Sequence, residues 1–233
     1  MKTTEEKLAK SLTAESTELI PHLPYLLQDL WEMGSSPKDM LELVRKHIHV
    51  SMKTKVLDLE CGKGAVSVYL AKELGRRVKG IDLIPEFIDV ALEKAEEFGV
   101  GEWCEFVVGD ITEAVKTEKD YDLVILGAVG DVLGNADETI RLINNTVKKD
   151  GYILIDDAYA KEKANANYLT REQWLEIFNN TGVRLVDEKI IEEDELASIN
   201  NDQQEQIVKR ARELKEKLPV SMWPMVSRRT STC

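Results

Sequence analysis

Residues 56–64, Val-Leu-Asp-Leu-Glu-Cys-Gly-Lys-Gly, decide the fold of this chain, and Gly80-Ile81-Asp82 follows one helix length later. An apolar strand, a glycine turn, a helix and a second strand ending in an acid form the nucleotide-binding half of an α/β fold. There the turn lets the backbone approach a ligand, and the acid binds ribose hydroxyls. The stretch therefore predicts a ligand that contains adenosine.

The spacing within the turn distinguishes two kinds of adenosine ligand. A dinucleotide fingerprint needs G-x-G-x-x-G, whose third glycine allows close helix packing while the helix start holds a pyrophosphate. Here the residue three positions after Gly64 is Ser67, and Ala65-Val66 open the helix. The turn therefore suits an adenosine ligand without a pyrophosphate.

This stretch resembles motif I of the class I S-adenosylmethionine-dependent methyltransferases, hh-D-h-G-x-G-x-G, and the resemblance extends from about Thr54 to Asp157. The sequence departs from the family pattern at two places. Glu60 replaces the first motif glycine, and the family's L-x-P-G-G turn is reduced to Asp150-Gly151. The later matches follow in the family's order: Asp82-Leu83, Gly109-Asp110-Ile111, the strand 121–127, and the turn and strand 149–156.

The resemblance implies S-adenosyl-L-methionine as cofactor and assigns roles at the strand ends. Asp82 would bind the ribose with Leu83 against the adenine, and Asp110 would accept from the adenine amino group with Ile111 covering the ring. Glu60 stands where the ammonium of the methionine part would lie, and a carboxylate there would form a charge-assisted bond. The predicted cofactor site comprises Glu60, Gly62, Gly64, Asp82, Leu83, Asp110, Ile111 and Gly127.

Methyl transfer from a sulfonium is an in-line displacement, so the protein must align the reactants and exclude water. A base is needed only if the acceptor is protonated. Asp131 and Asp157 follow the fourth and fifth predicted strands and are the catalytic candidates, with exposed loop acids or helix N-caps as the alternative. Aromatic side chains are candidates for the acceptor pocket or, alternatively, for the core: Tyr25, Trp31, Tyr159 and Tyr168. We expect no metal site, because Leu126-Gly127 lacks the acid of metal-dependent relatives.

From Thr54 onward, strands and helices alternate, which predicts a Rossmann-like, mostly parallel sheet with helices on both faces. We expect an N-terminal helical cap over 1–50, whose segment 18–33 closes as a lid, and a methyltransferase core over 51–233. Strands are expected near 55–59, 77–82, 104–108, 121–126, 152–156 and 184–191. The candidate for a seventh strand is 222–227, which Pro224 limits to a sheet edge or excludes. Helices are expected near 25–33, 36–48, 64–74, 85–98, 137–148, 170–180 and 193–217.

Composition narrows the class of protein. A chain of 233 residues, 43% hydrophobic and 32% charged, suits one folded α/β domain with additions. A net charge of −12 argues against nucleic acid, whose binding depends on Lys and Arg. There is no apolar run of the roughly 20 residues that span a bilayer, and residues 1–7 lack a signal-peptide core. These features predict a cytoplasmic protein without a membrane partner, and they leave its oligomeric state open.

The sequence thus predicts an S-adenosylmethionine-dependent methyltransferase that acts on an unidentified small molecule. Two alternatives stay open. One is an NAD-dependent oxidoreductase on a related fold, which Ser67 disfavours. The other is a non-catalytic protein that binds S-adenosylmethionine, which the replacement of a motif glycine by Glu60 keeps open.

Overall fold

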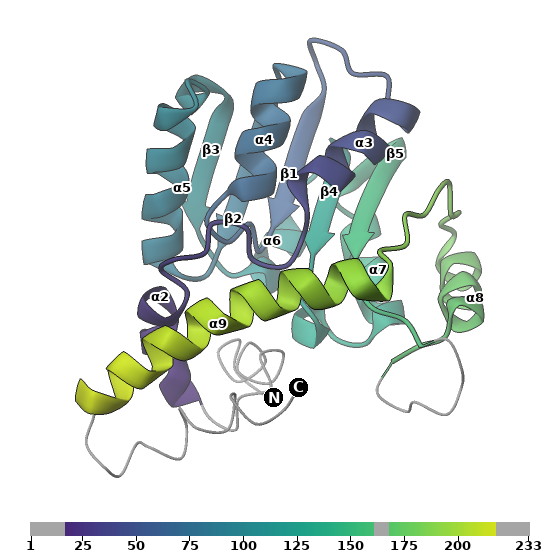
Figure 1. Cartoon of the computed structure of the whole chain (residues 1–233). Helices are drawn as coiled ribbons and strands as arrows, with labels where there is room; N and C mark the ends of the chain where they lie inside the picture. Colours follow the sequence, from purple (N-terminus) through teal and green to yellow (C-terminus); the bar gives the residue numbers. More distant parts are fainter. Residues whose placement is uncertain (1–16, 161–167, 218–233) are drawn as a thin grey trace. The chain divides into compact units, whose positions relative to one another are not determined.

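The computed structural model describes residues 17–160 and 168–217 (Figure 1). The chain divides into two compact units, residues 32–188 and residues 1–31 together with 189–233. This division differs from a boundary at residue 50, because helix α3 (Pro37–His47) packs against α4 (Ala65–Leu74) of the unit that holds the sheet. The extent of a separate cap domain stays a prediction.

A parallel sheet forms the centre of the larger unit, which confirms the predicted fold class. Its strands are β1 (Lys55–Leu59), β2 (Arg77–Asp82), β3 (Cys104–Val108), β4 (Tyr121–Gly127) and β5 (Val147–Asp156). They lie in the order β3-β2-β1-β4-β5, and every neighbouring pair is parallel. The strand order therefore reverses at β1: β2 and β3 lie on one side of it, and β4 and β5 lie on the other.

Helices cover both faces of this sheet (Figure 1). Helices α3, α4 and α5 (Pro85–Glu97) lie on one face, and α6 (Ile111–Thr117) and α7 (Ala136–Asn144) lie on the other. Helix α8 (Arg171–Thr181) packs on α7. The central strands are buried on both sides, so β1 and β4 are apolar almost throughout, with Leu57, Val124 and Ile125 fully buried.

Helix ends in this unit follow the capping signals of the sequence. Ser36 accepts a hydrogen bond from the Asp39 N–H (3.3 Å), and Pro37 occupies the first turn of α3. The predicted capping box of Thr170 and Gln173 opens α8, and Gly182 ends it in the left-handed conformation. Short 3₁₀ turns precede β3 (η2, Gly101–Trp103) and follow β4 (η3, Asp131–Leu133).

The smaller unit contains η1 (Thr17–His22), α2 (Leu23–Leu26) and the long α9 (Glu193–Lys217). The helix expected over 25–33 is wrong, since α2 ends at Leu26 and the chain then turns, with the Leu30 N–H bonded to the Leu27 carbonyl (3.0 Å). Within this unit Tyr25 donates a hydrogen bond to Glu213 (2.7 Å), and Arg210 forms a bidentate pair with Asp29.

Three predicted elements differ in the structure. Residues 184–191 form no strand; within them Asp187 accepts from Lys46 (2.7 Å) and contacts His47 (2.7 Å). Helix α7 ends at Asn144 instead of 148, and β5 begins at Val147 instead of 152. Within β5 Asp150 takes a positive φ of 64°, which accommodates an irregularity in the ladder. The doubtful seventh strand, 222–227, lies outside the described residues.

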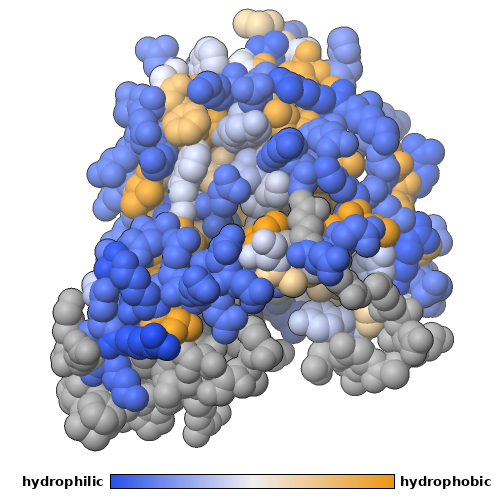
Figure 2. All heavy atoms as spheres, viewed as in Figure 1, coloured by the Kyte–Doolittle hydropathy of each residue, from blue (hydrophilic) through white to orange (hydrophobic). Residues whose placement is uncertain are grey.

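The face of the described chain seen in Figure 2 is mostly hydrophilic, with apolar side chains in small separate patches. This agrees with the high charged fraction of the sequence. Among the described residues, no helix combines the length and the apolar character needed to span a bilayer.

Candidate active site

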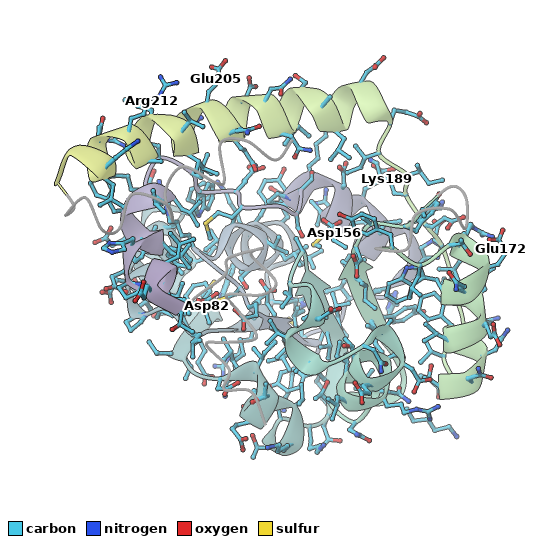
Figure 3. The ribbon with its side chains drawn as sticks, turned by 90° about the horizontal axis from the view of Figure 1, so that it is seen from below. Asp82, Asp156, Glu172, Lys189, Glu205 and Arg212 are labelled. Carbon is cyan, nitrogen blue, oxygen red and sulfur yellow. The ribbon has the colours of Figure 1, made fainter. Side chains whose placement is uncertain are left out.

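The carboxyl ends of the five parallel strands meet at one edge of the sheet, and the strand order reverses there between β1 and β4. In open α/β sheets ligands bind in the crevice at this reversal. Figure 3 looks toward this edge and shows Asp82 at the end of β2 and Asp156 at the end of β5. The site is therefore built outward from β1 and β4, between these two acids.

Asp82 joins the end of β2 to the glycine turn after β1. Its Oδ2 accepts from the Gly62 N–H (2.8 Å), and its Oδ1 accepts from the Ile84 N–H (2.9 Å). Burial raises the pKa of Asp82 to about 6, although these backbone donors act in the opposite direction. Each carboxylate oxygen has a second lone pair, so the group can also accept from two hydroxyls of a ligand.

The glycines of the turn are needed for close packing. Gly64 precedes α4 with a φ of 75°, and a Cβ there would lie 2.8 Å from the Ala91 Cβ and 2.9 Å from the Phe106 ring. Gly62 also has a positive φ, 54°, and a Cβ there would meet the end of the Met33 side chain. The turn therefore lies tightly against α5 and β3.

Glu60 is the unusual residue of this turn. It has a φ of 58°, a conformation that favours glycine, as the family motif would have here. Its side chain is partly exposed, but its Oε1 is buried and has no hydrogen-bond partner among the described residues. Burial, followed by the charges of Asp82 and Asp110, raises the pKa of Glu60 well above its ordinary value. Backbone strain and an unsatisfied polar atom together are typical of functional sites.

Asp58 and Ser67 explain why the third glycine of a dinucleotide fingerprint is missing. Ser67 is fully buried, and its hydroxyl donates to Asp58 Oδ2 (2.6 Å), which ties α4 to β1. Burial raises the pKa of Asp58 to about 7, with the Ser67 hydrogen bond opposing the shift and the Asp82 charge adding to it. This pair fixes the first turn of α4 where a dinucleotide fold needs a bare glycine.

The predicted adenine contacts lie beside Asp82. Asp110 caps α6 by accepting from the Thr112 N–H (2.7 Å), and Leu83 is half-buried. Ile111 lies wholly within the hydrophobic core, so its side chain packs the protein interior. Sequence reasoning missed Val108, which pairs in register with Asp82 and is 49% exposed. An apolar residue at the end of an edge strand, just before Gly109-Asp110, was its only signal.

Sequence reasoning also missed a segment that crosses the ends of β1 and β4. The side chain of Met33 lies against Gly62, Gly34 lies against the Ala128 Cβ, and Ser35 lies over Gly127. A Cβ on Gly127 would come within 2.4 Å of the Ser35 hydroxyl, so glycine at that position permits the approach. The sequence signals were only the small pair Gly34-Ser35 before the start of α3.

The acidic residues proposed for catalysis gather after β4 and β5. Asp157 is exposed and accepts from the Ala158 N–H (2.7 Å). Its surroundings raise its pKa chiefly by desolvation, with the charges of Asp156 and Asp131 adding to the shift and the Ala158 N–H opposing it. Asp156 and Asp131 therefore both lie within electrostatic reach of Asp157.

The four aromatic residues predicted to line the acceptor pocket differ in exposure and in the unit to which they belong. Tyr159 is half-buried and Tyr168 is 51% exposed, whereas Tyr25 and Trp31 belong to the smaller unit. Their place in an acceptor pocket stays a prediction. Among residues 17–160 and 168–217, no group of three or more His, Cys, Asp or Glu side chains is arranged to hold a metal ion.

The parallel sheet, the glycine turn and the acid after β2 define a Rossmann-like methyltransferase domain. The model of a methyltransferase domain family matches residues 51–213, and the chain belongs to that family. This confirms the family resemblance of the sequence and, for that domain, the expected class of enzyme and its cofactor, S-adenosyl-L-methionine.

Several individual proteins are similar to parts or most of this chain. A methyltransferase of Geobacter sulfurreducens, solved with S-adenosyl-L-homocysteine, superposes with a TM-score of 0.75 at 20% identity, over 90% of this chain and 88% of that one. The ribosomal protein L11 methyltransferase of Exiguobacterium sp. is 28% identical over 137 residues, 59% of this chain and 38% of that protein. The demethylmenaquinone methyltransferase of Lactobacillus johnsonii is 28% identical over 115 residues, 47% of each protein. The chain thus spans less than half the length of these two curated relatives.

Proposed function

We propose that the whole protein transfers a methyl group from S-adenosyl-L-methionine to a small molecule bound over the ends of β4 and β5. The observation that carries this proposal is the acidic, partly unsatisfied set of groups at the ends of β1 and β2. Asp82 is fixed by two backbone donors, and Glu60 presents a buried oxygen without a partner among the described residues. A cationic ligand with vicinal hydroxyls supplies the donors that this set lacks.

The residues present therefore fit the cofactor, which brings a methyl group on a positively charged sulfur. Asp82 would accept from both ribose hydroxyls, and the glycine turn would give the ligand backbone access at the end of β1. Asp110 would take the adenine amino group, with Leu83 and Val108 offering apolar surface beside it. These contacts hold one end of the ligand over β2 and β3.

Catalysis by this chain would rest on orientation, since an in-line displacement needs the acceptor aligned with the methyl group and water excluded. Asp157 would take a proton from an acceptor that carries one; desolvation raises the pKa of its carboxyl, which supports this role. Asp131, whose charge acts on Asp157, would orient a basic acceptor. Both assignments belong to the proposal.

A small-molecule acceptor is favoured by charge. A net charge of −12 opposes the approach of RNA or DNA. The curated relatives named above are called methyltransferases of a ribosomal protein and of demethylmenaquinone, so membership of the family leaves the acceptor open. A cytoplasmic location stays part of the proposal.

The test is an assay of metabolite extract with methyl-labelled S-adenosyl-L-methionine and the purified protein, followed by mass spectrometry of the labelled product. We expect a labelled small molecule and stoichiometric S-adenosyl-L-homocysteine. Calorimetry with S-adenosyl-L-homocysteine and NAD tests the dinucleotide alternative. Binding of NAD alone would overturn the proposal, and cofactor binding with no labelled product from any extract would support a non-catalytic binding protein.

A further inference from the structure

A buried hydroxyl at the end of β4 is unsatisfied. The Oγ of Ser35 has no hydrogen-bond partner among residues 17–160 and 168–217, and the residue as a whole is only 8% exposed. A buried polar atom without a partner costs about 1–3 kcal/mol, so such atoms are rare in native proteins. A ligand group that hydrogen-bonds to this hydroxyl would remove the cost.

The sheet register places this hydroxyl on the same side as Asp156. A Cβ on Gly127 would lie 2.4 Å from the Ser35 Oγ and 3.3 Å from the Cε of Met40, so it would face α3. Gly127 is in register with Asp156 of β5, and the Ala128 N–H continues the ladder by donating to the Asp156 carbonyl (3.0 Å). Paired residues of neighbouring parallel strands project to the same face, about 4.8 Å apart. The Asp156 carboxyl and the Ser35 hydroxyl therefore approach one space, from β5 and from the segment before α3.

The charges around this space are negative. Asp156 is half-buried at the end of β5 (Figure 3), and Asp157 follows it. Desolvation is the largest cause of the raised pKa of Asp157, and the charges that add to it come from Asp156 and Asp131. Three acids at the ends of β4 and β5 produce a local potential that attracts a cation.

The available donors and acceptors distinguish the chemical groups that this space could bind. An ammonium group has three N–H donors and no acceptor, so it can donate to the Asp156 carboxylate and to the Ser35 hydroxyl at once. A neutral hydroxyl has one donor and satisfies one of the two. A carboxylate or phosphate adds negative charge to a site that is already acidic. The ammonium group is therefore the complementary one.

We infer that Ser35 and Asp156 form a specificity subsite for a protonated amino group of the methyl acceptor, an inference that rests on the proposed function. The substrate class is then a basic amine. The carboxylate is the charged partner, and the Ser35 hydroxyl accepts a second hydrogen bond. The subsite holds the amine as an anchor and so orients the acceptor for the in-line displacement.

The experiment compares three probes of similar shape: benzylamine, benzyl alcohol and benzoate. They carry an ammonium, a hydroxyl or a carboxylate group on the same ring. Ligand-observed NMR titrations at neutral pH, with the protein saturated with S-adenosyl-L-homocysteine, give the affinity of each probe. The variants are Asp156→Asn and Ser35→Ala, with Asp89→Asn as the matched control, since Asp89 is exposed on α5. Calorimetry with S-adenosyl-L-homocysteine shows whether each variant keeps its cofactor site.

We expect benzylamine to bind about 10-fold or more tightly than the other two probes. Asp156→Asn should reduce this preference by about 10-fold and Ser35→Ala by about 3- to 10-fold, while Asp89→Asn leaves it unchanged. Affinity for S-adenosyl-L-homocysteine should change less than about 2-fold in every variant, because the subsite binds the acceptor. In the extract assay, the labelled product should contain a basic nitrogen.

The inference is overturned if benzylamine shows no measurable binding or no preference, or if Asp156→Asn or Ser35→Ala leaves the preference unchanged. A labelled product without a basic nitrogen also overturns it. These outcomes are distinct from failure of the proposed function, in which the unaltered protein does not bind S-adenosyl-L-homocysteine at all.

Discussion

Replacing Gly64 by alanine tests how tightly the turn at the cofactor site is packed. The residue has a φ of 75°, and the added Cβ would lie 2.8 Å from the Ala91 Cβ and 2.9 Å from the Phe106 ring. The left-handed conformation costs a non-glycine residue roughly 1–2 kcal/mol. Crowding in a packed interior adds about 1–3 kcal/mol. We therefore expect Gly64→Ala to lower the free energy of unfolding by about 2–5 kcal/mol.

Gly99→Ala separates the two contributions, because Gly99 has a similar φ of 70° and no atom within 4 Å of its added Cβ. This control should lose only the conformational part, about 1–2 kcal/mol. Urea unfolding followed by circular dichroism measures both variants, and the difference should appear in thermal melts as about 2–12 °C, at roughly 2–4 °C per kcal/mol. Equal losses in the two variants would refute the reasoning that packing, rather than φ alone, demands glycine at position 64.

The remaining predictions concern cofactor binding, the pH dependence of stability and backbone hydrogen exchange. Asp82→Ala should weaken binding of S-adenosyl-L-homocysteine by about 2–3 kcal/mol, roughly 30- to 150-fold in calorimetry, because two charge-assisted hydrogen bonds to the ribose are lost; unchanged affinity in a folded variant would remove Asp82 from the site. The pKa of Asp58 is about 7 in the folded protein and 3.8 as its ordinary value, so the folded state binds the proton more tightly and the contribution of Asp58 to stability falls as pH rises between these values. Urea unfolding should therefore show Asp58→Asn gaining stability relative to the unaltered protein between pH 5 and pH 8, by about 3 kcal/mol at most, and a pH-independent difference would contradict the raised pKa. If segment 18–33 closes over the ligand, its backbone hydrogen exchange should slow when S-adenosyl-L-homocysteine binds, whereas strong protection that binding leaves unchanged would assign Tyr25 and Trp31 to the core.

The elements nearest the glycine turn could be predicted from local sequence. The bounds of β1, β2 and β3 match the expected ranges. Residues 184–191 are also β-branched and apolar in part, yet a strand requires a neighbour with which to form a ladder, and local sequence says nothing about that neighbour. The fold could therefore not be predicted where it depends on contacts between segments distant in the sequence.

The same limit applies to the site. Gly62, Gly64 and Asp82 could be found because their roles depend on spacing within one strand-turn-helix unit. Ser35 could not, since it reaches Gly127 across 92 positions of the chain and has no motif around it. The buried Oε1 of Glu60 could not be foreseen either, because the usual expectation for a non-glycine residue is a negative φ.

Met33, Gly34 and Ser35 lie on the strand ends, and the boundary between the two compact units falls only a few residues earlier, between Trp31 and Glu32. One of the two covalent connections between the units is thus continuous with the segment that crosses the ends of β1 and β4. If a ligand in the crevice restrains Ser35, thermodynamic reciprocity requires that a restraint on the neighbouring residues 32–34 changes the affinity for that ligand by the same factor.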